Sequence, residues 1–403
     1  MGVQTLRLGG GDSTWTELHT SLLQAKAVAP GHESVCEATV EALNAPLGFP
    51  PLSRAVTPDD QVAIALGEGV PAAASVVEGI VRSLADCEIS AAQVAVVTTQ
   101  AHVEERLRGA LGALCDAGLI LETHDPDDEE SLCFAGLTHS DRQLKLNRRL
   151  FDADLLLPVW SARARDGVDE SPFAGVYPMF GDRETIQRFT RVRSVLAASD
   201  PESNHATVRR AELREAGWMI GAPMVLAVAP AVSGEAPTVL AGDPVAVAEG
   251  SNAACREAWS APAPEPAQLV VAVLGGDAAV QTWGDVGRAL QSAERIREPG
   301  GVVALWSDLD EPVGEAMAKL TDAEDLGQVI GELGELSGEE AWAAWQLAQA
   351  LERGPVFFHS RHDADTLERL GVAPVGTEKE LERLAQRHAS GAVLQEAQHV
   401  WFD

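Results

Sequence analysis

His102 has a side chain and a position that suit acid–base chemistry. It follows an apolar segment of strand length, Gln93 to Val97, and the polar turn Thr98-Thr99-Gln100. An imidazole exchanges protons near neutral pH. The carboxyl end of a parallel strand is also where α/β sheets bind ligands. We therefore take His102 as a candidate catalytic residue, and the alternative is an ordinary surface histidine at the start of a helix.

Two glycine-rich turns have the composition of phosphate-binding loops. Gly275-Gly276-Asp277 follows the apolar segment Leu269 to Leu274, but it lacks the full dinucleotide fingerprint. Gly9 to Ser13 lacks the lysine and the second spaced glycine of a Walker loop. We expect a tight strand-to-helix turn at the first and a flexible turn at the second.

Two short segments contain metal-binding residue types. His124 to Asp128 (HDPDD) has carboxylates crowded around a proline, and such carboxylates usually point outward from a turn. His359 to Asp363 (HSRHD) has two histidines three residues apart at a strand exit, with Ser360 or Asp363 as a helix N-cap. A single short run rarely supplies a converging ligand set, so we expect turns and not metal sites.

The elements that must position these residues alternate between strand and helix. Continuous apolar runs of strand length are typical of buried parallel strands, and they occur at Gln61–Leu66, Gln93–Val97, Ala153–Val159, Ala222–Ala229 and Gln268–Leu274. Helical spacing of apolar residues lies between them, at Ala73–Asp86 and Val103–Ala117. This alternation predicts an α/β fold with parallel sheets.

The proline-rich segment Ala261 to Gln268 (APAPEPAQ) is the clearest boundary. Alternating prolines form a semi-rigid, extended linker. A second α/β pattern follows it, with expected elements at Val286–Arg297, Val302–Trp306, Leu320–Gly334, Glu339–Glu352, Val356–His359, Ala364–Leu370 and Ala392–Phe402, and a turn at Pro299-Gly300-Gly301. We predict two α/β domains, residues 1–262 and 268–403, with a cleft between them.

Composition excludes several classes of partner. Of the 403 residues, 46% are hydrophobic and 23% are charged, as in ordinary globular proteins. The net charge of -31 argues against nucleic acid and against anionic membrane surfaces. No apolar stretch approaches the roughly 18 residues of a membrane helix, and no signal peptide is evident, so we expect a cytoplasmic protein. The five cysteines are scattered and give neither a disulfide framework nor a metal motif.

Taken in order, a set of segments resembles the nickel-pincer lactate racemase family over almost the whole chain. The resemblance rests on order and spacing together, in Ala45–Leu66 (beginning APLGFPP), Thr123–Asp128, Leu146–Arg149, Ala153–Leu155, Ser171–Gly175, Arg183–Ile186, Ala241–Pro244, Pro299–Gly301 and Gly371–Val375. The resemblance implies that a lysine covalently holds a nickel-bearing pyridinium nucleotide. In that family the metal takes a hydride from a 2-hydroxy acid and returns it to either face, while histidines ligate nickel and move the hydroxyl proton, and an arginine helps to hold the substrate.

Matched position by position, most of the family's functional residues are replaced. The arginine after the first strand falls on Pro71, within Gly67–Ala72, and the histidine of the next turn falls one residue before His102. A further family histidine falls on Ser171, and a nickel-ligand histidine on Thr190. The loop that carries the tethering lysine is shortened to Val176–Asp182 and contains no lysine. The whole chain has four lysines, Lys26, Lys145, Lys319 and Lys379.

In the second domain, the family's glutamine and lysine above the substrate correspond to Asp285 and Arg288. The site residues that we predict are therefore His102, Asp285 and Arg288, with no bound cofactor. One hypothesis is a binding or partner protein that has lost racemase activity. The alternatives are an enzyme that uses a changed site on a small carboxylic acid, or a divergent racemase or epimerase. The ligand class that we expect is a small carboxylic acid.

Overall fold

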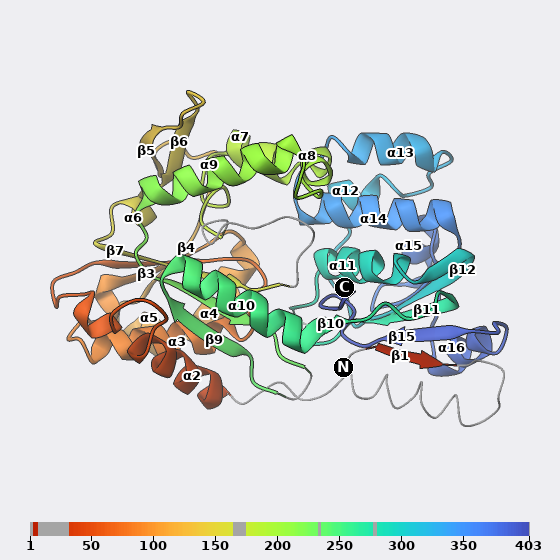
Figure 1. The fold of residues 1–403 in the computed structure, drawn as a ribbon, viewed down its shortest axis with the longest axis horizontal. Helices are drawn as coiled ribbons and strands as arrows, with labels where there is room; N and C mark the ends of the chain where they lie inside the picture. Colours follow the sequence, from red (N-terminus) through yellow and green to blue (C-terminus); the bar gives the residue numbers. More distant parts are fainter. Residues whose placement is uncertain (1–2, 7–31, 164–174, 233–234, 277–279, 403) are drawn as a thin grey trace.

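A computed structural model describes residues 3–6, 32–163, 175–232, 235–276 and 280–402. Its architecture is mixed α/β, with two separate sheets that each have six described strands (Figure 1). The predicted fold class is confirmed.

The first sheet holds the apolar segments that were expected to be buried strands. Its order is β4 (Ile120–Thr123), β3 (Val94–Thr98), β2 (Val62–Leu66), β7 (Leu155–Ser161), β8 (Val225–Ala229) and β9 (Thr238–Gly242). Every neighbouring pair is parallel except β8 and β9. All residues of β2, β3 and β8 are buried, because helices cover both faces of the sheet.

Helices of the first half include α2 (His32–Asn44), α3 (Ala73–Ala85) and α10 (Pro244–Trp259). The prediction of a single helix from Val103 to Ala117 is wrong in one respect. The helix is divided into α4 (Ala101–Ala110) and α5 (Gly112–Asp116) at Leu111, whose φ of -104° and ψ of 25° are not helical. Gly109 and Gly112 flank the break, and glycine is a weak helix former.

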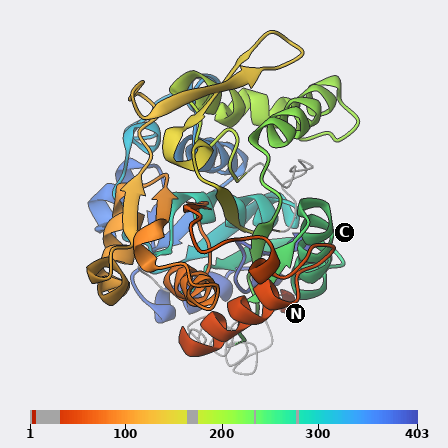
Figure 2. The same ribbon diagram turned by 90° about the vertical axis from the view of Figure 1, so that its left-hand side faces the viewer.

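A hairpin of β5 (Leu132–Leu137) and β6 (Gln143–Asn147) projects from the first half, as Figures 1 and 2 show. The short α6 (Arg148–Phe151) follows it. Beyond β7, the helices α7 (Arg183–Thr190), α8 (Val192–Ala197) and α9 (Asn204–Ile220) extend toward the second half (Figure 1).

The second sheet has the order β1 (Val3–Leu6), β15 (Gly391–Leu394), β11 (Ala267–Val273), β12 (Arg297–Trp306), β13 (Val356–His359) and β14 (Ala373–Pro374). Only the β1–β15 pair is antiparallel among these described strands. The covering helices include α11 (Trp283–Glu294), α12 (Glu315–Ala318), α13 (Leu326–Leu333), α14 (Glu339–Arg353), α15 (Ala364–Arg369) and α16 (Glu378–Ala385).

Three expected boundaries in this half are corrected. The helix from Val286 begins earlier and ends at Glu294, and the helix near Leu320 is confined to α13. The expected turn Pro299-Gly300-Gly301 lies inside β12, where the strand bulges. Ala267 faces Arg297 but Leu269 faces Val302, and Gly300 has a φ of +75°. A strand interrupted by a bulge looks like a turn in sequence, because both use proline and glycine.

The strands divide between the sheets near the proline-rich segment, with one exception. Leu226 and Val271 belong to different sheets, but β1 joins the second sheet although it comes first in the chain. Val192 of α8 is also buried in the second core, and β10 (Ser260–Ala261) pairs with β16 (Trp401–Phe402). The domain boundaries at 262 and 268 stay a prediction.

Within the described residues, every helix is too short or too polar to span a membrane.

Candidate functional site

The first sheet reverses its strand order between β2 and β7. From β2 the chain crosses to β3 on one side, and it returns later to β7 on the other side. Loops that diverge at such a point leave a crevice at the carboxyl ends of the strands. Glu68 follows β2 by two residues and Arg163 follows β7 by two residues. The two loops begin side by side, because the N–H of Gly67 donates to the carbonyl of Val159 at 2.8 Å.

The second sheet supplies the start of α11 at its own reversal, where β11 lies between β12 and β15. Thr282 caps this helix and accepts a hydrogen bond from the N–H of Asp285 at 3.3 Å. In return, the Asp285 carboxylate accepts from the N–H of Thr282 at 3.0 Å. This capping box fixes Asp285 and, one turn later, Arg288 on the first part of α11.

Arginines from the two halves meet at one carboxylate. Nη1 of Arg163 lies 2.8 Å from Oε1 of Glu339, and Nη1 of Arg288 lies 3.2 Å from the same oxygen. Nη2 of Arg288 also lies 2.7 Å from Oδ1 of Asp285. The Arg288 side chain is 8% exposed and that of Glu339 is 38% exposed. We call Glu68, Arg163, Asp285, Arg288 and Glu339 the interdomain charge cluster.

Glycines make room for these charged groups. A Cβ at Gly69, whose φ is +64° as in left-handed turns, would lie 2.4 Å from Nη2 of Arg163. A Cβ at Gly284 would lie 2.3 Å from Oε2 of Glu339. At Gly287 it would lie 2.9 Å from Cα of Ala343, so α11 and α14 approach closely. The sequence therefore permits the close contact that brings Arg288 to Glu339.

Within the described residues, Glu68 is the carboxylate of the cluster that forms no ion pair with an arginine. Among hydrogen bonds within the described residues it takes part in one, accepted by Oε1 from the Thr99 hydroxyl at 3.0 Å. Burial and then repulsion from Glu339 raise the pKa of Glu68 to about 7, although the Thr99 bond and the charge of Arg163 act in the opposite direction. Such a group changes its protonation near neutral pH.

The other two carboxylates are held ionised. Burial opposes ionisation of Glu339, but the charges of Arg288 and Arg163 prevail and lower its pKa. Burial likewise opposes ionisation of Asp285, and the charge of Arg288 again lowers the pKa. Both therefore act as permanent anions at neutral pH.

His399 adds no positive charge to this region. Its ring lies 4.9 Å from that of Trp259, at the end of α10. Burial, followed by repulsion from Arg288 and Arg163, lowers the pKa of His399 to about 4, although Asp285 acts against this shift. The imidazole is thus neutral near pH 7.

The structure brings two of the three predicted site residues together. Asp285 and Arg288 form an ion pair within the cluster. His102 is exposed in the first turn of α4, and the hydrogen bonds and ion pairs within the described residues do not connect it to the cluster. Catalytic roles for these three residues stay a prediction.

Sequence analysis missed Glu68, Arg163 and Glu339. A usable signal existed for the first two, since each is a charged residue two positions after a buried parallel strand, and the strands flank the reversal. No comparable signal marks Glu339 beyond its place at the start of a helix.

The histidine segments have structural roles. His124 is buried, and its ring contacts the carbonyl of Gly181 at 2.8 Å and the amide of Asn147 at 3.3 Å. The neighbouring aspartates are exposed, as expected of a turn. Asp363 caps α15 by accepting from the N–H of Thr366 at 2.8 Å, which confirms one of the two expected caps. No three histidine, cysteine or acidic side chains gather in a metal-binding group in the described part of the chain.

The glycine turns are only partly described. Gly276 has a φ of +85°, in keeping with the tight turn expected after β11. Asp277, Gly9 to Ser13 and Ser171 lie outside the described residues.

The region matched to the family's cofactor loop is packed with other side chains. Tyr177 and Phe180 are fully buried, and the Tyr177 hydroxyl donates to Oε1 of Glu212 at 2.9 Å. Arg188 donates to the same carboxylate, with Nη1 at 2.8 Å from Oε2. These groups satisfy one another and leave no amine in the segment from Val176 to Asp182.

Thr190, at the position matched to the family's nickel-ligand histidine, already forms other hydrogen bonds. The Thr190 hydroxyl donates to the carbonyl of Ile186 at 2.8 Å, and its own carbonyl accepts from the N–H of Gly338 at 3.2 Å. Lys145 and Lys319 are engaged by Glu129 and Glu332, at 2.8 and 3.1 Å. The residues present here do not fit a lysine-tethered, histidine-ligated nickel cofactor.

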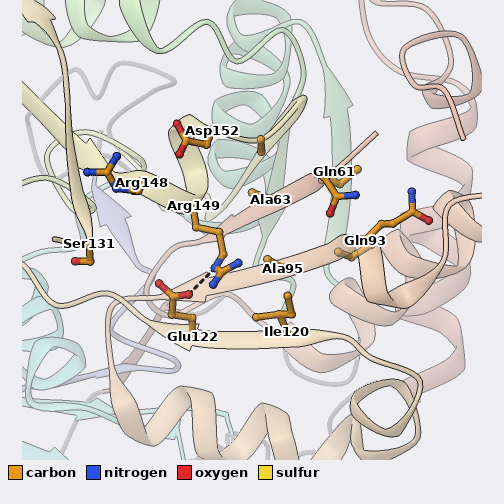
Figure 3. Close-up of a pocket in the computed structure, with 13 residues that line it drawn as sticks. Gln61, Ala63, Gln93, Ala95, Ile120, Glu122, Ser131, Arg148, Arg149 and Asp152 are labelled. Carbon is orange, nitrogen blue, oxygen red and sulfur yellow. Dashed lines mark hydrogen bonds and ion pairs between the residues drawn. The ribbon is translucent and has the colours of Figure 1, made fainter. Parts of the chain in front are cut away.

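A separate cavity of about 440 Å³ lies at the amino ends of β2 and β3 (Figure 3). Arg149 faces it but pairs with Glu122 at 2.5 Å. Arg148 donates to the carbonyls of Glu130 and Leu132, at 3.1 and 2.8 Å. Because its cations are engaged, and because ligands of α/β sheets bind at the opposite edge, we do not assign a function to this cavity.

No family model matches the sequence, and no curated protein matches it. Among solved structures, the chain is similar to the lactate racemase apoprotein from Thermoanaerobacterium thermosaccharolyticum. The TM-score is 0.72 at 15% identity, over 99% of this chain and 100% of that one. It is also similar to a Thermotoga maritima protein solved by the Northeast Structural Genomics Consortium, with a TM-score of 0.66 at 12% identity, over 94% and 99% of the two chains. The chain therefore has the fold of lactate racemase.

Proposed function

We propose that this protein binds a small carboxylic acid at the interdomain charge cluster and does so without a nickel-pincer cofactor. The observation that carries the proposal is the convergence of Arg163 and Arg288 on one oxygen of Glu339. Guanidinium groups are well suited to recognise carboxylates. Glu339 thus marks a position that a ligand carboxylate can take, at the carboxyl edge where α/β sheets bind ligands.

Several features support binding without the cofactor. The loop from Val176 to Asp182 offers no amine, and Thr190 offers a hydroxyl that is bonded within its own helix. Tyr177, Arg188 and Glu212 satisfy one another in the same region. The net charge of -31 further supports a small-molecule partner and not nucleic acid.

A second candidate function is proton-transfer catalysis on the same class of ligand. Glu68 favours it, because a carboxyl group with a pKa of about 7 can both accept and donate a proton near neutrality. Exchange of the α-hydrogen of lactate or alanine in D₂O, followed by NMR, tests this function. Exchange that disappears in Glu68→Gln supports catalysis, and no exchange with the wild type leaves binding as the function.

Isothermal titration calorimetry with acetate, lactate, alanine and succinate tests the binding proposal. We expect at least one of these ligands to bind, and Arg163→Met or Arg288→Met to weaken it by about a hundredfold, as expected for loss of charged hydrogen bonds. Arg163 is the more exposed of the two, at 25%, so its variant keeps the test valid if Arg288→Met fails to fold.

Arg149→Met is the matched control, since Arg149 pairs with Glu122 in the cavity at the opposite edge of the sheet. Binding that survives both cluster substitutions, or that is lost in Arg149→Met, would contradict the proposed site. Absence of binding for all four ligands would contradict the proposed function.

A further inference from the structure

The interdomain charge cluster contains more carboxylates than guanidinium groups. Glu68, Asp285 and Glu339 face Arg163 and Arg288, and the neighbouring His399 is neutral near pH 7. A plain carboxylate ligand would add another negative charge to a partly buried anionic site. That addition is costly where the effective dielectric constant is low.

The excess negative charge is located at Glu68. Glu339 and Asp285 each contact an arginine, whereas the hydrogen bond of Glu68 within the described residues comes from the neutral Thr99 hydroxyl. Its neighbour Gly69 lies against Nη2 of Arg163, and the charges of Glu339, Arg163 and Arg288 all act on the Glu68 carboxyl group. A cationic group placed beside Glu68 would supply the missing positive charge.

From this arrangement, and resting on the proposed function, we infer that the ligand is a small zwitterion of the 2-amino acid type. Its carboxylate takes the place of Glu339 at Arg163 and Arg288, and its ammonium group pairs with Glu68 and with the displaced Glu339. Because the zwitterion has no net charge, the ligand itself adds no negative charge to the cluster. A 2-hydroxy acid of the same shape supplies the carboxylate but no cation, so Glu68 acts as the specificity-determining residue.

The inference also sets the direction of proton movement on binding. Burial and repulsion from Glu339 raise the pKa of Glu68 to about 7, against the Thr99 hydrogen bond and the charges of Arg163 and Arg288, so the group is partly protonated near pH 7. An ammonium group favours its ionised form, so a zwitterion should release a proton on binding. A hydroxy acid favours the protonated form and should take up a proton.

Alanine and lactate are the probes, because they differ in an ammonium group against a hydroxyl. We expect alanine to bind at least about tenfold more tightly than lactate near pH 7.5, the effect of one favourable charge pair. Glu68→Gln should abolish that difference. Titrations in buffers of different ionisation enthalpy should give proton release for alanine and uptake for lactate. Glu332→Gln, at an exposed carboxylate paired with Lys319, is the control and should keep the wild-type ratio.

The outcomes separate this inference from the proposed function. Lactate that binds as tightly as alanine, or a preference that persists in Glu68→Gln, overturns the inference while carboxylate binding stands. Ethylamine that binds as tightly as alanine means a site for a cation alone, which overturns the two-point recognition. Absence of binding for both alanine and lactate overturns the inference, and absence of binding for acetate and succinate as well removes the proposed function.

Discussion

Two arginine–glutamate networks in this molecule differ in how completely their charges are satisfied. In the first, Glu212 is 9% exposed and receives hydrogen bonds from Tyr177 and Arg188. In the second, Glu339 is 38% exposed and shares one oxygen between two arginines, while no ion pair in the described part of the chain joins Glu68 to an arginine. In the first network every named polar group has a partner, whereas in the second Glu68 has only the neutral Thr99 hydroxyl as a hydrogen-bond partner within the described residues.

The difference separates a structural role from a ligand-binding role. Tyr177 and Arg188 lie in the region that the lactate racemase resemblance assigns to cofactor attachment, and there they fill the interior between α7 and α9. The interdomain charge cluster lies at the carboxyl edge of the first sheet, which is the edge where α/β sheets bind ligands. Substitutions should therefore affect stability at the first network and binding at the second.

Glu212→Ala should give the largest loss of stability. It removes the acceptor of a buried hydroxyl and of a partly buried guanidinium, and we expect the free energy of unfolding to fall by about 3 kcal/mol. Urea denaturation measures this change. Ligand binding at the interdomain charge cluster should stay within a factor of about two in the folded variant.

Glu215→Ala is the matched control on the same helix. Its carboxylate pairs with His139, whose side chain is 96% exposed, and exposed pairs contribute less than about 1 kcal/mol. An equal loss of stability in both variants would contradict the distinction between a closed buried network and an ordinary surface pair.

Glu68→Gln should change the pH dependence of stability more than stability itself. The pKa of Glu68 is raised from 4.5 to about 7 in the folded protein, so between these values the folded state holds a proton that the unfolded state has lost. The contribution of Glu68 to stability therefore falls as pH rises through this window, and glutamine has no such term. Relative to the wild type, the variant should be more stable near pH 8 than near pH 5, as urea denaturation at several pH values will show.

His399→Gln should change the pH dependence of the free energy of unfolding in the opposite direction, and the same urea denaturation series measures it. The lowered pKa of His399, about 4, means that the unfolded state binds more protons below pH 6.5, so its contribution to stability rises with pH.

For Glu68, a pH-independent difference in stability between the wild type and Glu68→Gln would mean that Glu68 is not held in the environment described here.

The sheets were predictable from sequence because their strands are continuous apolar runs. Val62–Leu66, Val94–Thr98 and Val225–Ala229 are buried on both faces and carry a strong local signal. The bulge in β12 and the break at Leu111 were missed, because each depends on local backbone geometry that resembles a turn or a continuous helix in sequence. The pairing of β1 with β15 depends on contacts between the two ends of the chain, which no local pattern records.

The site was predictable only in part. Asp285 and Arg288 were identified by resemblance, but their partners Arg163 and Glu339 lie 125 and 51 positions away from Arg288 along the chain, and only folding brings them together. His102 follows a strand as expected, yet it is exposed at the start of α4. A position directly after a strand predicts the edge of the sheet at which a residue lies. Packing, in contrast, decides where its side chain points.

Intact-mass spectrometry and metal analysis test the central claim most directly, on protein co-expressed with the nickel-pincer biosynthesis machinery. The account predicts the mass of the bare chain and no stoichiometric nickel, because the loop from Val176 to Asp182 has no lysine and Thr190 replaces an imidazole ligand. A covalent adduct on Lys26, Lys145, Lys319 or Lys379, together with one nickel per chain, would contradict it.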